Sequence, residues 1–102
     1  MRQSLIAPPL LARLTALRPV FEREGITRMW LVGSRARGDN RADSDIDLMV
    51  EIDETRPFSL LDLIGVKHIV EDEIGLPADM LMRRSRSSSL AARTDLDALA
   101  IF

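Results

Sequence analysis

The residues between positions 33 and 47 combine a turn suited to phosphate with a pair of carboxylates. Gly33 and Ser34 follow an apolar segment, and Asp45 and Asp47 come after a ten-residue spacer. Backbone N–H groups and a hydroxyl at a tight turn suit phosphate oxygens. Acids at alternate positions of a strand lie on one face, with Cα atoms roughly 6–7 Å apart, where both can bind a hard divalent cation. A phosphate-binding turn and a cation-binding pair together indicate chemistry on nucleotides.

Asp79 is the candidate for a third carboxylate. It interrupts the apolar segment at residues 77–82. An acid in a buried strand is costly unless it is paired or bound to a metal. Two alternatives stay open from the residues alone: an acid on an edge strand that faces water, or an ion-pair partner of Arg83 or Arg84.

Three polar side chains of the spacer are further candidates for nucleotide binding: Arg35, Arg37 and Ser44. One arginine is expected to contact phosphate and the other to form an internal ion pair that holds the loop, and the sequence does not tell them apart. For Arg37, an ion pair with Asp43 is an alternative to ligand contact. Ser44 either binds phosphate or orients the loop before Asp45.

The elements that must position these residues follow from the spacing of apolar side chains. Leucines at helical spacing predict a first helix that starts at Pro8 and Pro9. Pro19 predicts either a kink or a second short helix that ends at Gly25. Residues 26–32 predict a strand whose apolar end indicates a central place in a sheet. Residues 39–44 are polar and predict a turn.

Residues 45–52 alternate as a half-buried strand does, with the even-numbered side chains on the buried face. Pro57 predicts the start of a long helix that ends at Gly75. The buried stripe of that helix is predicted to comprise Leu60, Leu63, Ile64, Val66, Val70 and Ile74. Residues 77–82 predict a third strand.

The last part of the chain predicts a loop and a short helix. Residues 83–89 are basic and serine-rich, and residues 94–97 resemble a helix N-terminus. Arg83, Arg84 and Arg86 form a local basic cluster. A solvated loop is the simplest interpretation of it, with RNA, an acidic partner surface or the tail of ATP as alternatives.

The element order helix, strand, strand, helix, strand, helix predicts an α/β (α+β) fold, in which helices pack on a small mixed sheet. With 102 residues, the expectation is a single domain over residues 1–102 with one modest core. The net charge of −2 gives no basic field, so direct nucleic-acid binding is not expected. Cysteine is absent, which excludes disulfides and thiolate metal sites. No apolar run could span a bilayer and no secretory leader is evident, so a cytoplasmic protein without a membrane partner is expected.

The residues from Gly33 onward resemble the nucleotidyltransferase superfamily that includes DNA polymerase beta, and within it the minimal nucleotidyltransferases. The family motif is Gly-Ser, a ten-residue spacer and Asp-x-Asp, found here as Gly-Ser-Arg-Ala-Arg-Gly and Ser-Asp-Ile-Asp-Leu. The resemblance covers nearly the whole chain and implies a polymerase-beta-like fold. It implies that Asp45, Asp47 and Asp79 are catalytic and bind two Mg²⁺ ions, with Mn²⁺ as the alternative. It also implies that Asp79 is the general base, and that Gly33 and Ser34 hold a triphosphate.

The same resemblance implies a biological role. Members of the antitoxin branch transfer AMP from ATP to a tyrosine of a helical HEPN-type ribonuclease toxin. Larger members carry a second domain that grips the acceptor, so a second copy of this chain or another protein is expected to complete the site. Two alternatives are a nucleotide-binding antitoxin that acts by contact alone and an enzyme that modifies an aminoglycoside-like small molecule. The acceptor, the base preference and the oligomeric state stay open.

Overall fold

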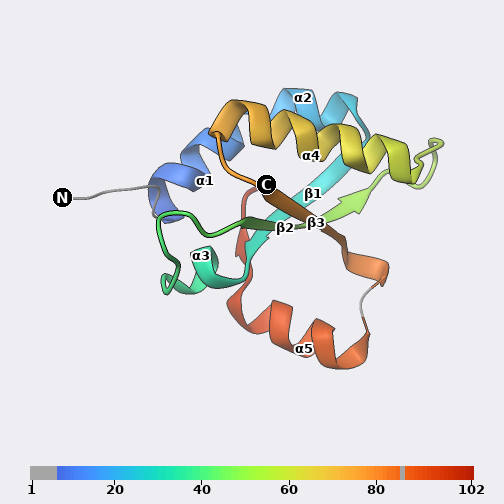
Figure 1. Cartoon of the computed structure of the whole chain (residues 1–102). Helices are drawn as coiled ribbons and strands as arrows, with labels where there is room; N and C mark the ends of the chain where they lie inside the picture. The colour runs from blue at the N-terminus through green and yellow to red at the C-terminus, as the bar shows by residue number, and fades with distance from the viewer. Residues whose placement is uncertain (1–6, 86) are drawn as a thin grey trace.

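A four-stranded sheet with the order β3-β2-β1-β4 forms the middle of the molecule, in a computed structural model that describes residues 7–85 and 87–102 (Figure 1). Strand β1 (Ile26–Val32) pairs antiparallel with β2 (Ile46–Ile52) and with β4 (Leu99–Ala100). Strand β3 (Ala78–Met82) pairs parallel with β2. The mixed sheet and the central place of β1 are therefore confirmed.

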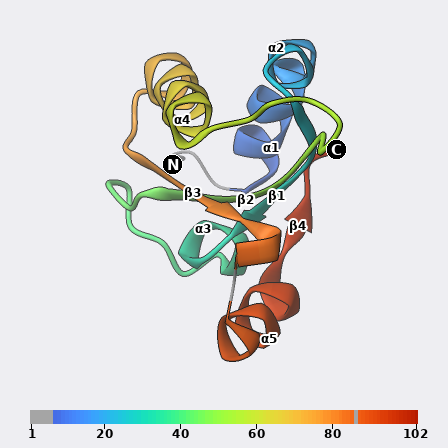
Figure 2. The same ribbon diagram turned by 90° about the vertical axis from the view of Figure 1, so that its right-hand side faces the viewer.

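Helices lie on both faces of this sheet. Helices α1 (Ala7–Ala16), α2 (Arg18–Arg23) and α4 (Leu60–Ile74) cover one face, and the short α3 (Ser34–Arg37) and α5 (Ser88–Asp97) lie on the other (Figure 2). The predicted α/β class with helices packed on a small mixed sheet is confirmed.

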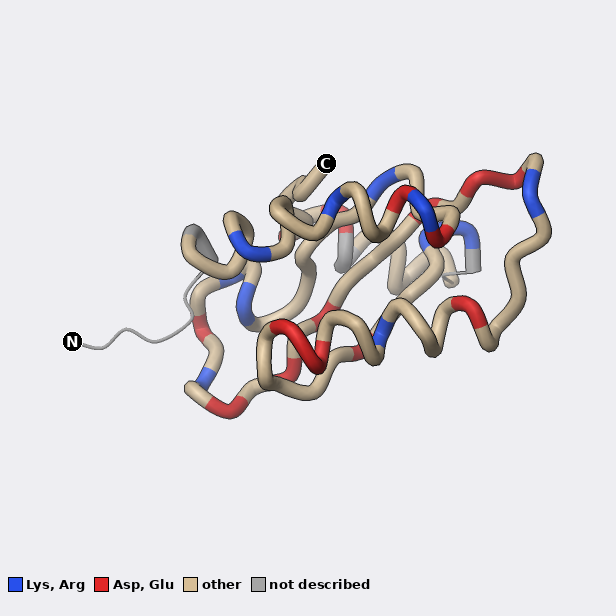
Figure 3. The backbone as a smooth tube through the Cα atoms, turned by 90° about the horizontal axis from the view of Figure 1, so that it is seen from above, with Lys and Arg blue, Asp and Glu red and all other residues tan. Residues whose placement is uncertain are grey.

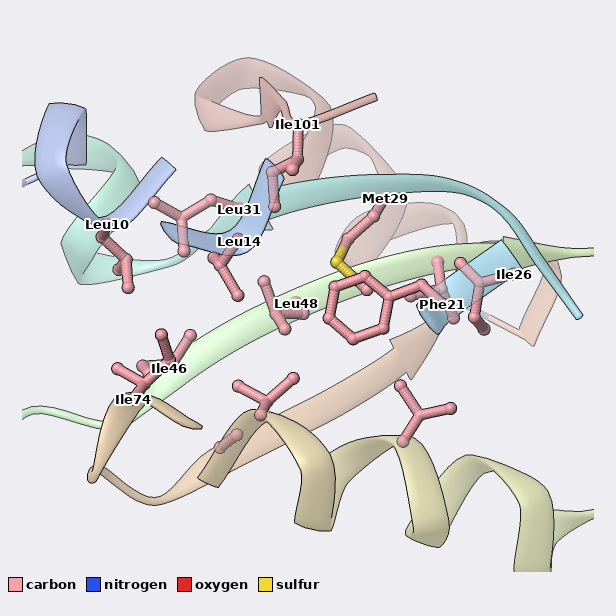
Figure 4. Close-up of a cluster of buried hydrophobic side chains, with 14 of the residues drawn as sticks. Leu10, Leu14, Phe21, Ile26, Met29, Leu31, Ile46, Leu48, Ile74 and Ile101 are labelled. Atoms are coloured by element: carbon pink, nitrogen blue, oxygen red, sulfur yellow. The ribbon is translucent and has the colours of Figure 1, made fainter. Parts of the chain in front are cut away.

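The hydrophobic core fills the space between the sheet and the first group of helices (Figure 4). Leu14 and Phe21 enter it from the helices, and Leu31 and Leu48 enter it from the sheet, all fully buried. On β2, the side chains of Ile46, Leu48 and Val50 point into this core, as the alternation predicted. Because side chains alternate along a strand, Asp47 must point to the opposite face.

Local capping sets the helix ends. Pro19 lies in the first turn of α2, so the second of the two predicted arrangements holds. Helix α4 begins at Leu60 rather than at Pro57, because Ser59 caps it: the Ser59 backbone N–H donates to Asp62 Oδ2 at 2.8 Å, and the Asp62 N–H donates to Ser59 Oγ at 3.4 Å. Gly75 ends the helix as predicted.

The buried stripe of α4 is shorter than predicted. Leu63, Val66, Val70 and Ile74 are buried, whereas the side chains of Leu60 and Ile64 are 71% and 38% exposed. The first turn of α4 therefore presents apolar side chains to solvent.

The C-terminal part differs most from its prediction. The expected loop at residues 83–89 contains a 3-10 turn at Arg83–Ser85 and the start of α5. The Leu90 N–H donates to Ser87 Oγ at 3.2 Å, so a serine of the expected loop caps the helix, which ends at Asp97. Strand β4 was not predicted, because two residues carry no periodicity and the strand exists only through pairing with β1. Arg86 lies outside the described residues.

The distribution of charged residues and the length of the apolar helices both bear on which partners the molecule can have. Acidic and basic positions are interspersed along the backbone rather than gathered on one side (Figure 3). Within the part of the chain that the structure describes, no helix is long and apolar enough to cross a membrane.

Candidate active site

The sheet register brings two of the predicted carboxylates together. Asp47 on β2 and Asp79 on β3 are direct partners in the parallel pairing of these strands. Their side chains therefore lie side by side on the face of the sheet that points away from the core. Asp45 lies one residue before β2 and is exposed, and it is close enough for its charge to act on Asp47. Asp79 is exposed on the edge strand rather than enclosed in a buried one, so the alternative of an edge-strand acid that faces water holds for its placement.

The charges of these acids act on one another. The pKa of Asp47 is raised, first by burial and then by the negative charges of Asp79 and Asp45, while the positive charge of Arg37 opposes the rise. A carboxyl group in this setting is stabilised by any cation that binds beside it. A cation bound at the outer face of β2 would therefore relieve the repulsion among these carboxylates.

Gly33 shapes the backbone against Asp47. Its φ of +76° is in the region that favours glycine, and a Cβ placed there would overlap with Asp47 Oδ2 and lie 3.1 Å from Asp47 Cγ. The chain then turns into α3, where the N–H groups of Ala36 and Arg37 each donate to the Gly33 carbonyl at 3.1 Å. The predicted Gly-Ser turn is thus the start of a helical turn packed directly on a candidate metal ligand.

Arg35 is buried, with 1% of its surface exposed, and its side chain forms hydrogen bonds to the loop before Asp45. Its Nε and Nη2 donate to the Ser44 carbonyl at 3.1 and 2.8 Å, and Nη2 also donates to the Ala42 carbonyl at 3.0 Å. The Arg41 N–H donates to Ser44 Oγ at 2.8 Å, so the Ser44 hydroxyl also orients the loop. These contacts favour the loop-holding alternative for Arg35, with loop carbonyls among its partners.

Replacing Arg35 is expected to loosen the Asp45 side of the site. Arg35→Lys keeps the charge but loses the planar fork, and it should lower kcat/KM for nucleotide transfer by about 10- to 100-fold and raise the Mg²⁺ concentration that activity needs. Arg41→Ala, at an exposed position of the same loop, is the control and should change neither. If Arg35→Lys raises only the KM for ATP and leaves the Mg²⁺ requirement unchanged, Arg35 contacts phosphate instead.

Arg37 is the more accessible of the two arginines. Its Nε lies 3.1 Å from Asp39 Oδ2 and its Nη1 lies 3.5 Å from Asp97 Oδ2, with 45% of the side chain exposed. The hydrogen bond and the charge of Asp39 raise the pKa of Arg37, and Asp97 adds to the rise. Its acidic partners are Asp39 and Asp97, which corrects the suggested pairing with Asp43.

A cavity of about 590 Å³ lies beside Gly33, Asp47 and Asp79, and its lining residues do not include Ser34, Arg35, Ser44 or Asp45. Its lining on the polar side consists of Gly33, Arg37, Asp47, Asp79 and Asp97. Val32 and Leu81 of the sheet and Leu90 and Leu96 of α5 are apolar residues of its lining, and Leu48 and Met80, whose side chains belong to the core on the other face, also border it. The volume is in the range of small-molecule sites. The sequence did not identify Leu90, Leu96 and Asp97 of α5 as residues of this site. Their spacing in the sequence carries no sign that they lie opposite the carboxylates of the sheet.

The donor set suits a divalent cation that shares its coordination with a ligand. Within residues 7–85 and 87–102, no three His, Asp or Glu side chains form a group that could hold a metal ion by themselves. Mg²⁺ is typically bound by one or two carboxylates together with substrate phosphates and water. The neighbouring carboxylates of Asp47 and Asp79 therefore fit a metal that arrives with a triphosphate.

Other singled-out residues lie away from this cavity. Arg83 pairs with Glu51 at 2.8 Å and Arg84 with Glu54 at 2.9 Å, so both charges are balanced locally. Trp30 is half-buried on the outer face, where the Arg28 guanidinium lies 5.2 Å from its ring centroid.

Comparison with known proteins agrees with this geometry. A family model described as nucleotidyltransferase domain matches residues 14–100. Protein adenylyltransferase MntA of Thermococcus cleftensis is 36% identical over 70 residues, which are 69% of this chain and 69% of that protein.

Two solved structures show the same fold. One, provisionally assigned as a minimal nucleotidyltransferase, has a TM-score of 0.79 and 31% identity, and the match covers 96% of this chain and 98% of that one. Another is a complex of a tri-AMPylated HEPN toxin with an MNT antitoxin from Shewanella oneidensis. It has a TM-score of 0.67 and 13% identity, covers 91% of this chain and 71% of that one, and is similar in fold alone. From the family match over residues 14–100, together with the 31% identical structure, the chain belongs to the nucleotidyltransferase family.

Proposed function

We propose that this chain transfers AMP from ATP to a tyrosine hydroxyl of a HEPN-type toxin and serves as its antitoxin. The observation that carries the proposal is the register that pairs Asp47 with Asp79 beside Gly33, inside one cavity. The relative named a protein adenylyltransferase and the similarly folded antitoxin, whose toxin partner is AMPylated, support the same reaction and acceptor.

In the proposed reaction the triphosphate lies against the turn at Gly33 and Ser34, with Arg37 beside it. The acceptor oxygen forms a bond to the α-phosphorus, the bond from that phosphorus to the bridging oxygen breaks, and pyrophosphate leaves with the electron pair. Asp79 takes the hydroxyl proton, because it is the exposed acid at the edge of the sheet, where another protein can reach it.

Asp45, Asp47 and Asp79 would hold the divalent cation, with Mg²⁺ as the expected ion and Mn²⁺ as the alternative. When bound, it would neutralise charge on the phosphates and lower the pKa of the attacking hydroxyl. The chain's own contribution is to hold the three acids on one face and to place the phosphates next to them.

The test is co-expression with a HEPN-type partner, followed by intact-mass analysis of that partner. The expected result is added mass in whole units of AMP with the wild-type chain and none with Asp47→Asn. Peptide mapping should place the addition on tyrosine. A partner that binds, loses its toxicity and keeps its mass would identify an antitoxin that acts by contact, and would overturn the proposed reaction.

A further inference from the structure

We propose that an apolar slot formed by Leu81, Leu90 and Leu96 is the subsite that binds the base of the nucleotide, which rests on the proposed function for the nature of the ligand. The slot is part of the same cavity as Gly33, Asp47 and Asp79. None of these leucines contributes to the core between the sheet and helices α1, α2 and α4.

The floor of the slot follows from the strand register. Asp47 pairs with Asp79, and two residues further along the same strands Met49 pairs with Leu81. Because side chains alternate, Leu81 lies on the same face as Asp79, roughly 6–7 Å further along β3. On the outer face of the sheet, the carboxylates of Asp47 and Asp79 are therefore followed two residues later on each strand by the apolar side chains of Met49 and Leu81.

The opposite wall comes from α5. Leu90 and Leu96 both line the cavity, and Leu96 is 85% exposed, the highest value among the large hydrophobic side chains of the described residues. A leucine this exposed beside a polar site gains most when a flat apolar ligand covers it.

Two contacts hold this wall in place. The ion pair of Arg37 with Asp97 joins the end of α5 to α3, with Arg37 Nη1 3.5 Å from Asp97 Oδ2. Directly after α5, Leu99 pairs with Leu31 in the sheet. The C-terminal end of α5 is thus attached to β1 and α3, the two elements on either side of Gly33.

The position of the slot favours the base over the acceptor. The base is joined through the ribose to the phosphate that reacts, so it must lie in the cavity that holds that phosphate. A tyrosine of another protein needs an open approach, which the exposed Asp79 at the edge of the sheet offers. A flat ring between leucine side chains is a common way to bind a base-sized ligand.

The experiment compares ATP with inorganic tripolyphosphate, which has the phosphates but no base, by calorimetry in Mg²⁺. Leu96→Ala should weaken ATP binding by about tenfold, because it removes most of one apolar side chain from the contact. It should leave tripolyphosphate binding unchanged. Leu96→Met, which keeps the apolar volume, should bind ATP as the wild type does.

Leu61→Ala is the matched control, since Leu61 is 78% exposed on α4 and does not line the cavity. It should change neither affinity. Unchanged ATP binding in both Leu96→Ala and the Leu90→Ala/Leu96→Ala double variant would overturn the inference, as would an equal loss for ATP and tripolyphosphate. Slower transfer to the partner with intact ATP affinity would assign the slot to the acceptor and would also overturn it. If the wild-type chain binds neither probe, the proposed function itself fails.

Discussion

Asp47→Asn is expected to abolish nucleotide transfer and to leave a folded protein that is more heat-stable at neutral pH than the wild type. The amide cannot supply the negative charge that a hard cation requires, so kcat/KM should fall by about 10²-fold or more. The fold should survive because the amide is isosteric and the core lies on the other side of the sheet.

The gain in stability follows from the direction of the pKa shift. Burial and the charges of Asp79 and Asp45 raise the pKa of Asp47 in the folded state, so its ionised form is less stable there than in the unfolded chain. The resulting loss of stability sets in as the pH rises from the unfolded pKa through the folded pKa. Asp47→Asn should therefore melt at a higher temperature than the wild type at about pH 7, and the difference should vanish at about pH 3.

The measurement pairs pyrophosphate release with thermal melts in a chelator, so that no bound metal offsets the repulsion. Asp45→Asn should lose activity in the same way, while Asp43→Asn, at an exposed acid two residues earlier, should keep it. Near-normal transfer by a folded Asp47→Asn variant would contradict the assignment of this acid to the metal.

Gly33→Ala is expected to have the second large effect, because a single methyl group there overlaps with the carboxylate of Asp47. The backbone also has φ of +76° and ψ of −156°, a region that glycine alone adopts readily and that costs other residues about 1–3 kcal/mol. Either the turn or Asp47 must move, and both changes disturb the place where phosphate and metal meet. Binding of ATP in Mg²⁺ should fall by at least about tenfold, and the bulkier Gly33→Val should bind still less.

Gly38→Ala separates strain from collision. Gly38 ends the same helical turn with φ of +84°, but a Cβ there meets nothing within 4 Å. The control should thus lose stability from the strain of its left-handed backbone while keeping most of its affinity for ATP. Equal losses of ATP affinity in the two variants would show that the close approach to Asp47 does not matter.

Short-range patterns in the sequence were enough for the elements and for half of the candidate site. The spacing from Gly33 to Asp47 lies within one strand-turn-strand unit, so residue types and alternation alone predict that acids follow a phosphate-binding turn on one face. The long helix before Gly75 and the strand at residues 26–32 were equally predictable, because their signals are local: apolar spacing, a cap and a terminal glycine.

Tertiary structure decided what depends on contacts between distant segments. Asp79 becomes the neighbour of Asp47 only through the parallel register of β2 and β3, and its exposure follows from the edge position of β3. Arg35 and Arg37 have the same side chain two positions apart, yet packing buries one against loop carbonyls and leaves the other at the cavity. Leu96 lies near the end of α5, and β4, which follows α5 directly, exists as a strand only because it pairs with β1. The position of Leu96 at the slot therefore depends on that pairing. Local sequence specifies which residues can do chemistry, whereas long-range pairing specifies which of them meet, because strand register and burial are properties of two segments together.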